Sequence, residues 1–252
     1  MGSTYLTLVN NVLDRLNEPN LDSSTFASAR GIHAAAKLGV KNAVLRINSQ
    51  KWEWPFNCVS DSETMVIGGN LYALPTNCKI PDWESFYVVA GTYGDFTVTT
   101  RNLKPIQRQE WFKRHRNLDF DNAVDGRDIP SRVFWDATHN GAGAGSFGVT
   151  PCPNAEYIIN FNYWKFTTAL SAHGDTTDVP TNFDWVIETG ALQDMYMFLD
   201  NDQRAALGKV DFEDAVNEMV RQLLPQDIGD VRDTRVNFGA GRYYSNHSDI
   251  MI

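Results

Sequence analysis

The chain has 252 residues, a formal net charge of −9 at pH 7, 42% apolar residues and 21% charged residues. A chain of this size and composition can bury a core without disulfide or metal staples. Its acidic balance argues against ordinary nucleic-acid binding, which needs a basic surface, and no apolar run approaches the roughly 18 residues of a transmembrane helix. Because the N-terminus lacks the pattern of a secretory signal, we expect assembly in the cytoplasm and reduced cysteines. The cysteines are Cys58, Cys78 and Cys152.

The N-terminal part of the chain predicts two helices. Apolar residues recur at three- and four-residue steps between residues 3 and 17, and Pro19 ends this first helix. A longer helix is expected from residue 23 or 24 to residue 50, and its glycines and alanines favour close packing of helices. Aromatic residues follow at once, and we expect them to form a buried joint between a helical domain and a β domain. These residues are Trp52, Trp54 and Phe56.

The next part of the chain favours β-strands joined by hairpins. Strand-like runs at residues 64–67 and 71–74 flank a Gly-Gly-Asn sequence, which is typical of a hairpin turn. Further strand-like runs at residues 86–90 and 96–100 flank a glycine-containing loop. We therefore expect two successive β-hairpins.

Residues 105–118 predict a short helix with Pro105 in its first turn. We expect Trp111 and Phe112 to face inward. The other face would carry the basic cluster of the chain, which is either a solvated surface or a contact with acidic protein or DNA phosphate. The cluster consists of Arg108, Lys113, Arg114, His115 and Arg116.

Two later patterns resemble ligand sites but lack the context that such sites need. Several aspartates occur between Asp119 and Asp128, but a calcium loop of the EF-hand type needs a different spacing and a terminal glutamate. Residues 143–148 match G-x-G-x-x-G, yet a proline and a strand follow where a dinucleotide site needs a helix. We expect a loop at residues 143–148, and we predict no catalytic, cofactor-binding or metal site.

From residue 129 to the end of the last predicted helix, strand and helix signals alternate. Pro151 and Pro153 interrupt the chain between two strands, because proline cannot donate to a sheet ladder. Pro180 precedes an amphipathic helix, and Pro225 ends the next one. The predicted elements are strands at residues 133–135 and 157–164 and helices at residues 182–199 and 202–224.

This order of strand, Pro-x-Pro, aromatic strand, loop and helix resembles that of the head-to-tail adaptors of short-tailed bacteriophages, a family often called tail tubular protein A. The resemblance extends to the first helix at residues 5–18, to the aromatic segment at residues 52–56 and to the strand at residues 71–75. It covers about residues 5–200 as spaced patterns rather than as catalytic motifs.

We therefore expect an α+β fold, in which N- and C-terminal helices form an α-helical bundle and an antiparallel β-sandwich or barrel is inserted between them. The expected helical domain combines residues 1–57 and 181–225. Residues 58–180 would form the β domain, and residues 226–252 would form an extended C-terminal docking arm.

The resemblance implies a structural virion protein and not an enzyme. Members of the family form a twelve-fold ring that joins the portal protein to the tail nozzle or tail tube. The genome passes through the axial channel of the ring without specific binding, and neither a cofactor nor a membrane takes part. Two alternatives remain open, namely a neck or head-completion protein of a long-tailed phage and a hydrolase that uses the acidic cluster at residues 119–128.

The predicted arm has an unusual composition. It shows no regular apolar period that would build a domain, but it interleaves arginines with aromatic residues, which are favoured at protein contacts. We expect it to dock on the portal or on a neighbouring subunit, and the alternative is a tail that folds back on its own bundle. The proposed contact residues are Arg232, Arg235, Phe238, Arg242, Tyr243 and Tyr244.

Overall fold

The computed structural model describes residues 2–50, 53–90, 99–116, 119, 126–136 and 145–224. The chain divides into two compact units. One unit, here called the β unit, combines Met1–Tyr5 with Val44–Pro180, and the other, the helical unit, combines Leu6–Ala43 with Thr181–Ile252. The structure contains α-helices as well as two β-sheets, so the predicted α+β class is confirmed.

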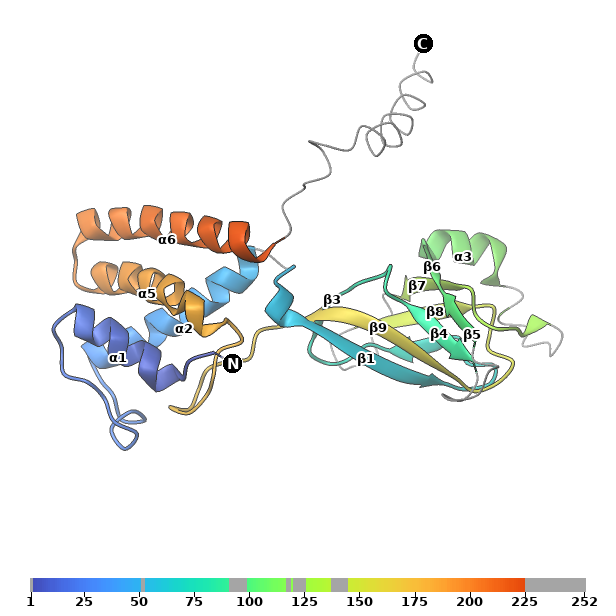
Figure 1. Ribbon diagram of the computed structural model, residues 1–252, viewed down its shortest axis with the longest axis horizontal. Coiled ribbons are helices and arrows are strands. Elements are labelled where there is room, and N and C mark those ends of the chain that lie inside the picture. The colour runs from blue at the N-terminus through green and yellow to red at the C-terminus, as the bar shows by residue number, and fades with distance from the viewer. Residues whose placement is uncertain are drawn as a thin grey trace, which may run out of the picture. The chain divides into compact units, whose positions relative to one another are not determined.

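The long helices of the chain lie close to their predicted positions, except at the start of α2 (Figure 1). Helix α1 buries one stripe of apolar side chains, as the three- and four-residue spacing predicted. Helix α6 also buries one face, which includes Phe212, Ala215 and Met219, whereas Val210 is 54% exposed. At the start of α6, the Asn201 side chain accepts a hydrogen bond from the backbone N–H of Arg204 at 3.1 Å and caps the helix. The bounds are α1 (Tyr5–Arg15), α2 (Ile32–Gln50), α5 (Asp184–Phe198) and α6 (Asp202–Leu223).

Helix α2 begins later than predicted, at Ile32 instead of residue 23 or 24. The Asp22 carboxylate accepts backbone N–H groups of Ser24 and Thr25, each at 2.8 Å, and this holds the segment in a turn. Gly31 has a φ of 57°, a left-handed conformation that a continuous α-helix does not allow. Side-chain bonding to the local backbone therefore replaces the first predicted turns of the helix.

Helix α5 packs against other helices of the helical unit. From α1, Arg15 forms an ion pair with Glu188 at 2.5 Å. Gly39 of α2 lies against α5 so closely that an added Cβ would sit 3.1 Å from the carbonyl oxygen of Ala191. Helix α6 returns along α5 (Figure 1), so α5 contacts all the other long helices of its unit.

The β unit contains two sheets that share one apolar core. The five-stranded sheet has the order β1–β9–β4–β5, with β3 also paired to β9, and the four-stranded sheet has the order β2–β8–β7–β6. Aromatic rings join the sheets, since the Phe86 ring lies 4.8 Å from that of Phe161 and 5.3 Å from that of Phe147. The bounds are β1 (Cys58–Met65), β2 (Leu71–Ala73), β3 (Cys78–Pro81), β4 (Tyr87–Ala90), β5 (Thr99–Asn102), β6 (Lys104–Ile106), β7 (Arg132–Asp136), β8 (Ser146–Thr150) and β9 (Tyr157–Lys165).

The predicted sheet architecture needs two corrections. Neither sheet closes into a barrel, and β6 pairs with β7 in parallel, so the β unit is not wholly antiparallel. The first predicted hairpin is also wrong, because β1 pairs with β9 while β2 pairs with β8 in the other sheet. Met65 at the end of β1 and Tyr72 on β2 both lie in the shared core. The chain therefore crosses from one sheet to the other between them and does not form a hairpin. The second predicted strand pair is confirmed as β4 with β5, although its connecting loop lies outside the described residues.

Candidate interaction surfaces

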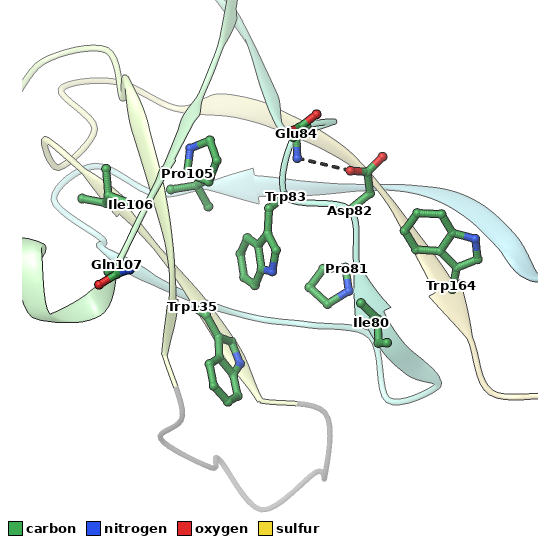
Figure 2. Close-up of a pocket in the computed structure, with 11 residues that line it drawn as sticks. Ile80, Pro81, Asp82, Trp83, Glu84, Pro105, Ile106, Gln107, Trp135 and Trp164 are labelled. Atoms are coloured by element: carbon green, nitrogen blue, oxygen red, sulfur yellow. Dashed lines mark hydrogen bonds between the residues drawn. The ribbon is translucent and has the colours of Figure 1, made fainter. Parts of the chain in front are cut away.

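A surface cavity of about 530 Å³ lies on the β unit, where residues of β3, β6, β7 and β9 come together (Figure 2). Its wall is mainly aromatic and aliphatic, and it includes the side chains of Trp83, Trp135 and Trp164. We call it the tryptophan groove. The remaining lining residues are Ile80, Pro81, Asp82, Glu84, Pro105, Ile106, Gln107 and Val133.

Local structure fixes Trp83 and Trp135 in this groove. Trp83 lies in a turn where Ser85 donates both its backbone N–H and its hydroxyl to the Asp82 carbonyl, at 3.1 and 2.7 Å. Its ring stacks on that of Phe86 at 5.4 Å. Trp135 lies on β7 between buried residues and is 55% exposed. An exposed aromatic side chain that lines a cavity together with other aromatic rings is a candidate contact for another molecule.

The groove also carries negative charge. Asp82 and Glu84 both line it, and the Asp82 carboxylate accepts the Glu84 backbone N–H at 3.2 Å (Figure 2). Aromatic faces beside carboxylates suit a ligand that combines cationic and apolar groups. The motifs and periodicity of the sequence did not predict this site. The Pro-Asp-Trp-Glu-Ser run at residues 81–85 was the available signal, because it places a tryptophan between two acids in a turn.

Helix α3 (Arg108–Arg114) is shorter than predicted, and Pro105 belongs to β6 instead of its first turn. Trp111 is buried and stacks on Phe134 at 4.5 Å, as expected for the inner face. Phe112 was predicted to face inward, but it is 44% exposed. The reason is geometric, since adjacent residues of a helix point about 100° apart and Trp111 occupies the one buried face.

Acidic partners neutralise part of the basic cluster. Arg108 pairs with Asp136 at 3.0 Å, and Arg114 pairs with Glu110 at 3.2 Å. The guanidinium groups of Arg108 and Arg116 lie over the Phe112 ring, at 5.5 and 4.9 Å from its centroid. A second cavity of about 440 Å³ lies here, and Trp135 lines it as well as the tryptophan groove.

The two weak ligand patterns of the sequence do not become sites in the part of the chain that the structure describes. Asp119 is buried and accepts a hydrogen bond from the Trp111 indole N–H at 2.6 Å. No described residues form a group of three or more histidine, cysteine, aspartate or glutamate side chains that could hold a metal. Residues 146–148 belong to strand β8, so the predicted loop is wrong there. Residues 120–125 and 143–144 lie outside the described ranges.

The cysteines are free thiols in the structure, and Cys78 and Cys152 are buried whereas Cys58 is exposed. Cys152 lies in the core, and its thiol contacts the Asp119 carboxylate. Burial, together with the negative charge of Asp119, raises the pKa of Cys152 to about 11. The thiol is therefore protonated and unreactive near neutral pH.

The segment after α2 contains one of the largest buried side chains. Trp54 is fully buried, donates its indole N–H to the carbonyl of Ile47 at 2.9 Å and stacks on Phe56 at 5.6 Å. Its expected burial is confirmed. Trp52 lies outside the described residues, and the role of this segment as a joint between domains stays a prediction.

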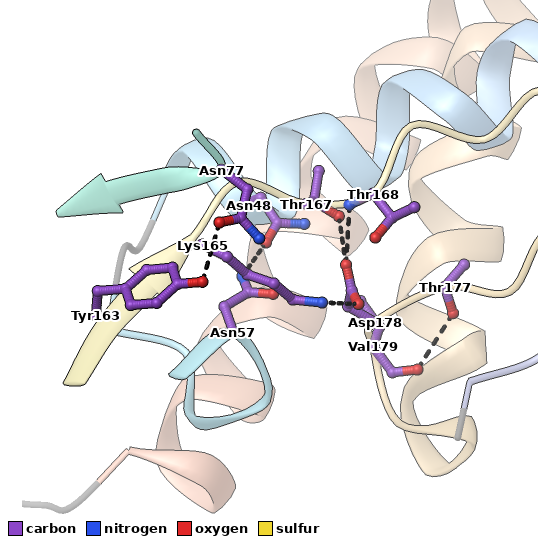
Figure 3. A network of polar contacts seen from close by, with 10 residues as sticks. All are labelled: Asn48, Asn57, Asn77, Tyr163, Lys165, Thr167, Thr168, Thr177, Asp178 and Val179. Carbon is purple, nitrogen blue, oxygen red and sulfur yellow. Dashed lines mark hydrogen bonds and ion pairs between the residues drawn. The ribbon is translucent and has the colours of Figure 1, made fainter. Parts of the chain in front are cut away.

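A polar network lies near this segment in the β unit (Figure 3). The Asp178 carboxylate accepts hydrogen bonds from the Lys165 ammonium at 2.6 Å and from the Thr168 backbone N–H at 2.9 Å. Burial opposes ionisation of Asp178, but these hydrogen bonds and the charge of Lys165 outweigh it and hold its pKa below the usual range. Asn48 and Asn57 are joined by a further side-chain hydrogen bond. The network therefore stabilises the fold through charged and amide groups.

The proposed contact residues between Arg232 and Tyr244 lie outside the described residues. Their docking stays a prediction. Among the helices that the structure describes, none is both long enough and apolar enough to cross a membrane.

Comparison with known families now identifies the class of the protein. The family model described as SU10 adaptor protein matches residues 3–238. The chain belongs to the SU10 adaptor protein family, which is a family of phage adaptors. No curated protein matches the sequence. The predicted phage adaptor class is thus confirmed, and membership implies a virion component that interacts with other virion components.

Proposed function

We propose that this protein is a structural head-to-tail adaptor of a short-tailed phage, similar to tail tubular protein A. It joins the portal protein to the tail nozzle or tail tube and performs no catalysis. The observation that carries this proposal is the match of the phage adaptor family over residues 3–238. The order of strands, prolines and helices in the sequence supports the same placement.

In this proposal twelve copies form a ring around an axial channel, after assembly in the host cytoplasm. Copies that associate through two different surfaces form a closed ring when the rotation from one copy to the next adds up to a full turn. The net charge of −9 on each copy gives the ring a strongly acidic character. Acidic groups on the channel wall would repel DNA phosphates, so that the genome slides through without being held during ejection.

We also propose that the chain has three parts with different roles. Residues 1–57 and 181–225 form a helical bundle, residues 58–180 form the β domain, and residues 226–252 form the docking arm. The packing of α5 against α1, α2 and α6 supports the bundle. Separate domains would allow one part of the adaptor to face the portal and another to face the tail.

Native mass spectrometry of the purified protein with assembled portal tests this function. We expect complexes that carry many copies of the adaptor on each portal ring. The portal mixed with an unrelated acidic protein of similar mass serves as the control. Complexes with only one adaptor would contradict the ring, and the absence of any complex would contradict the role as portal partner.

A further inference from the structure

We propose that the tryptophan groove of one copy receives the C-terminal arm of a second copy, through the arginine and aromatic side chains of residues 232–244. This inference rests on the proposed function and names the contact that links neighbouring copies. The groove lies within the residues that the structure describes, and the arm, residues 226–252, is argued from its sequence.

The groove has the chemistry of a receptor for a cationic, aromatic peptide. Trp83, Trp135 and Trp164 line a cavity of about 530 Å³, and Trp135 is left 55% exposed. Pro81 and Pro105 add rigid apolar walls. Asp82 and Glu84 also line the cavity. Indole faces bind cations best among aromatic side chains, and nearby carboxylates strengthen the attraction.

The arm carries the complementary groups. Arg232, Arg235 and Arg242 alternate with Phe238 and the pair Tyr243–Tyr244, and Asp233 is the one acidic residue between positions 232 and 244. Arginine stacks on indole and forms bidentate bonds to carboxylates, so a single arginine can use both features of the groove. Phenylalanine and tyrosine would fill the space beside the tryptophan rings.

The second copy is the occupant because the arm and the groove are different surfaces of the same chain. When the arm of one copy binds the groove of another, the pair still has one free arm and one free groove. Further copies can therefore add in the same way, and the assembly can close into a ring. Residues 226–252 in extended form would span up to about 90 Å, which is enough to reach a neighbouring subunit.

A complementation experiment with the full-length protein tests the contact. The groove variant carries Asp82→Asn and Trp135→Ala, and the arm variant carries Arg235→Gln and Arg242→Gln. We expect wild-type protein to self-associate with rising concentration in sedimentation velocity, and each variant alone to stay monomeric. A mixture of the two variants should form dimers only, because the intact arm of one fits the intact groove of the other.

The control changes an exposed aspartate and an exposed aromatic residue outside the groove. Asp61 and Phe166 are exposed and do not line the cavity, so Asp61→Asn with Phe166→Ala should associate like the wild type. Circular dichroism melting checks that each variant is folded. A second variant, Glu84→Gln at an exposed position of the groove, should weaken self-association about tenfold.

Two results would overturn the contact. The first is that the mixture of the two variants stays monomeric. This would mean that the wild type associates through another surface or that each arm binds the groove of its own copy. The second is unchanged association of the folded groove variant or of Glu84→Gln. Either result leaves the proposed function standing as long as the wild type still loads many copies onto the portal, so failures of the two proposals are distinguishable.

Discussion

In the β unit, the centre of the Phe86 ring lies 5.3 Å from that of Phe147 and 4.8 Å from that of Phe161, and large side chains fill the core. In the helical unit, α5 is packed so tightly that a Cβ added at Gly190 would sit 2.7 Å from the Phe212 ring and 3.0 Å from Ala43. The two units therefore offer different probes of their packing. The β unit loses stability when a ring is removed, and the helical unit loses stability when a glycine is enlarged.

Replacing Trp54 with alanine should have the largest effect on the β unit. The substitution removes a fully buried ring, its stacking on Phe56 and its hydrogen bond to Ile47. We expect a loss of about 4–5 kcal/mol in the free energy of unfolding, measured by urea denaturation. Trp54→Phe keeps most of the volume and should cost less. A Trp54→Ala protein with wild-type stability would show that the aromatic segment does not support the core.

Phe86→Ala should come next in the same unit. It removes the ring that touches both Phe147 and Phe161, and the expected loss is about 3–4 kcal/mol in the free energy of unfolding. The matched control is Phe166→Ala, because Phe166 is 58% exposed and should change stability by less than about 0.5 kcal/mol. Similar losses for the two variants would argue against an aromatic core.

The helical unit is tested by adding a methyl group. Gly190→Ala gains helix propensity but forces Phe212 and Ala43 apart, so we expect a net loss of about 1–3 kcal/mol. Gly208 on α6 is the matched control, because its added Cβ would lie 3.4 Å or more from its nearest neighbours. Gly208→Ala should therefore stabilise the protein by up to about 1 kcal/mol. Thermal melting of both variants measures the difference, and stabilisation by both would refute close packing at Gly190.

The smallest effect should come from the polar network of the β unit. Asp178→Asn weakens the contact with Lys165, and we expect a loss of about 1–2 kcal/mol at neutral pH. Because the pKa of Asp178 is lowered in the folded state, its stabilisation is present above the ordinary carboxyl pKa of about 3.9 and is lost as the pH falls through the folded pKa. The stability difference between wild type and variant should thus shrink in acid. A constant difference between pH 7 and pH 2 would contradict this role.

Local patterns in the sequence were sufficient for the long helices and for β9, but not for short strands such as β6 and β8. The periodic apolar residues of α1 and α6 and the β-branched and aromatic run of β9 predicted their types and approximate bounds. The start of α2 was missed because the Asp22 turn uses side-chain hydrogen bonds that compete with the helix. Apolar periodicity does not report such bonds.

The sequence by itself determined the α+β class, the long helices at both ends of the chain and the resemblance to a phage adaptor, because these depend on residue order and local periodicity. Only the tertiary structure decided that β2 pairs with β8, that β6 runs parallel to β7 and that Trp135 faces outward. It also brought Trp83, Trp135 and Trp164 into one groove. Strand partners are chosen by contacts between residues far apart in the chain, so no local pattern contains them.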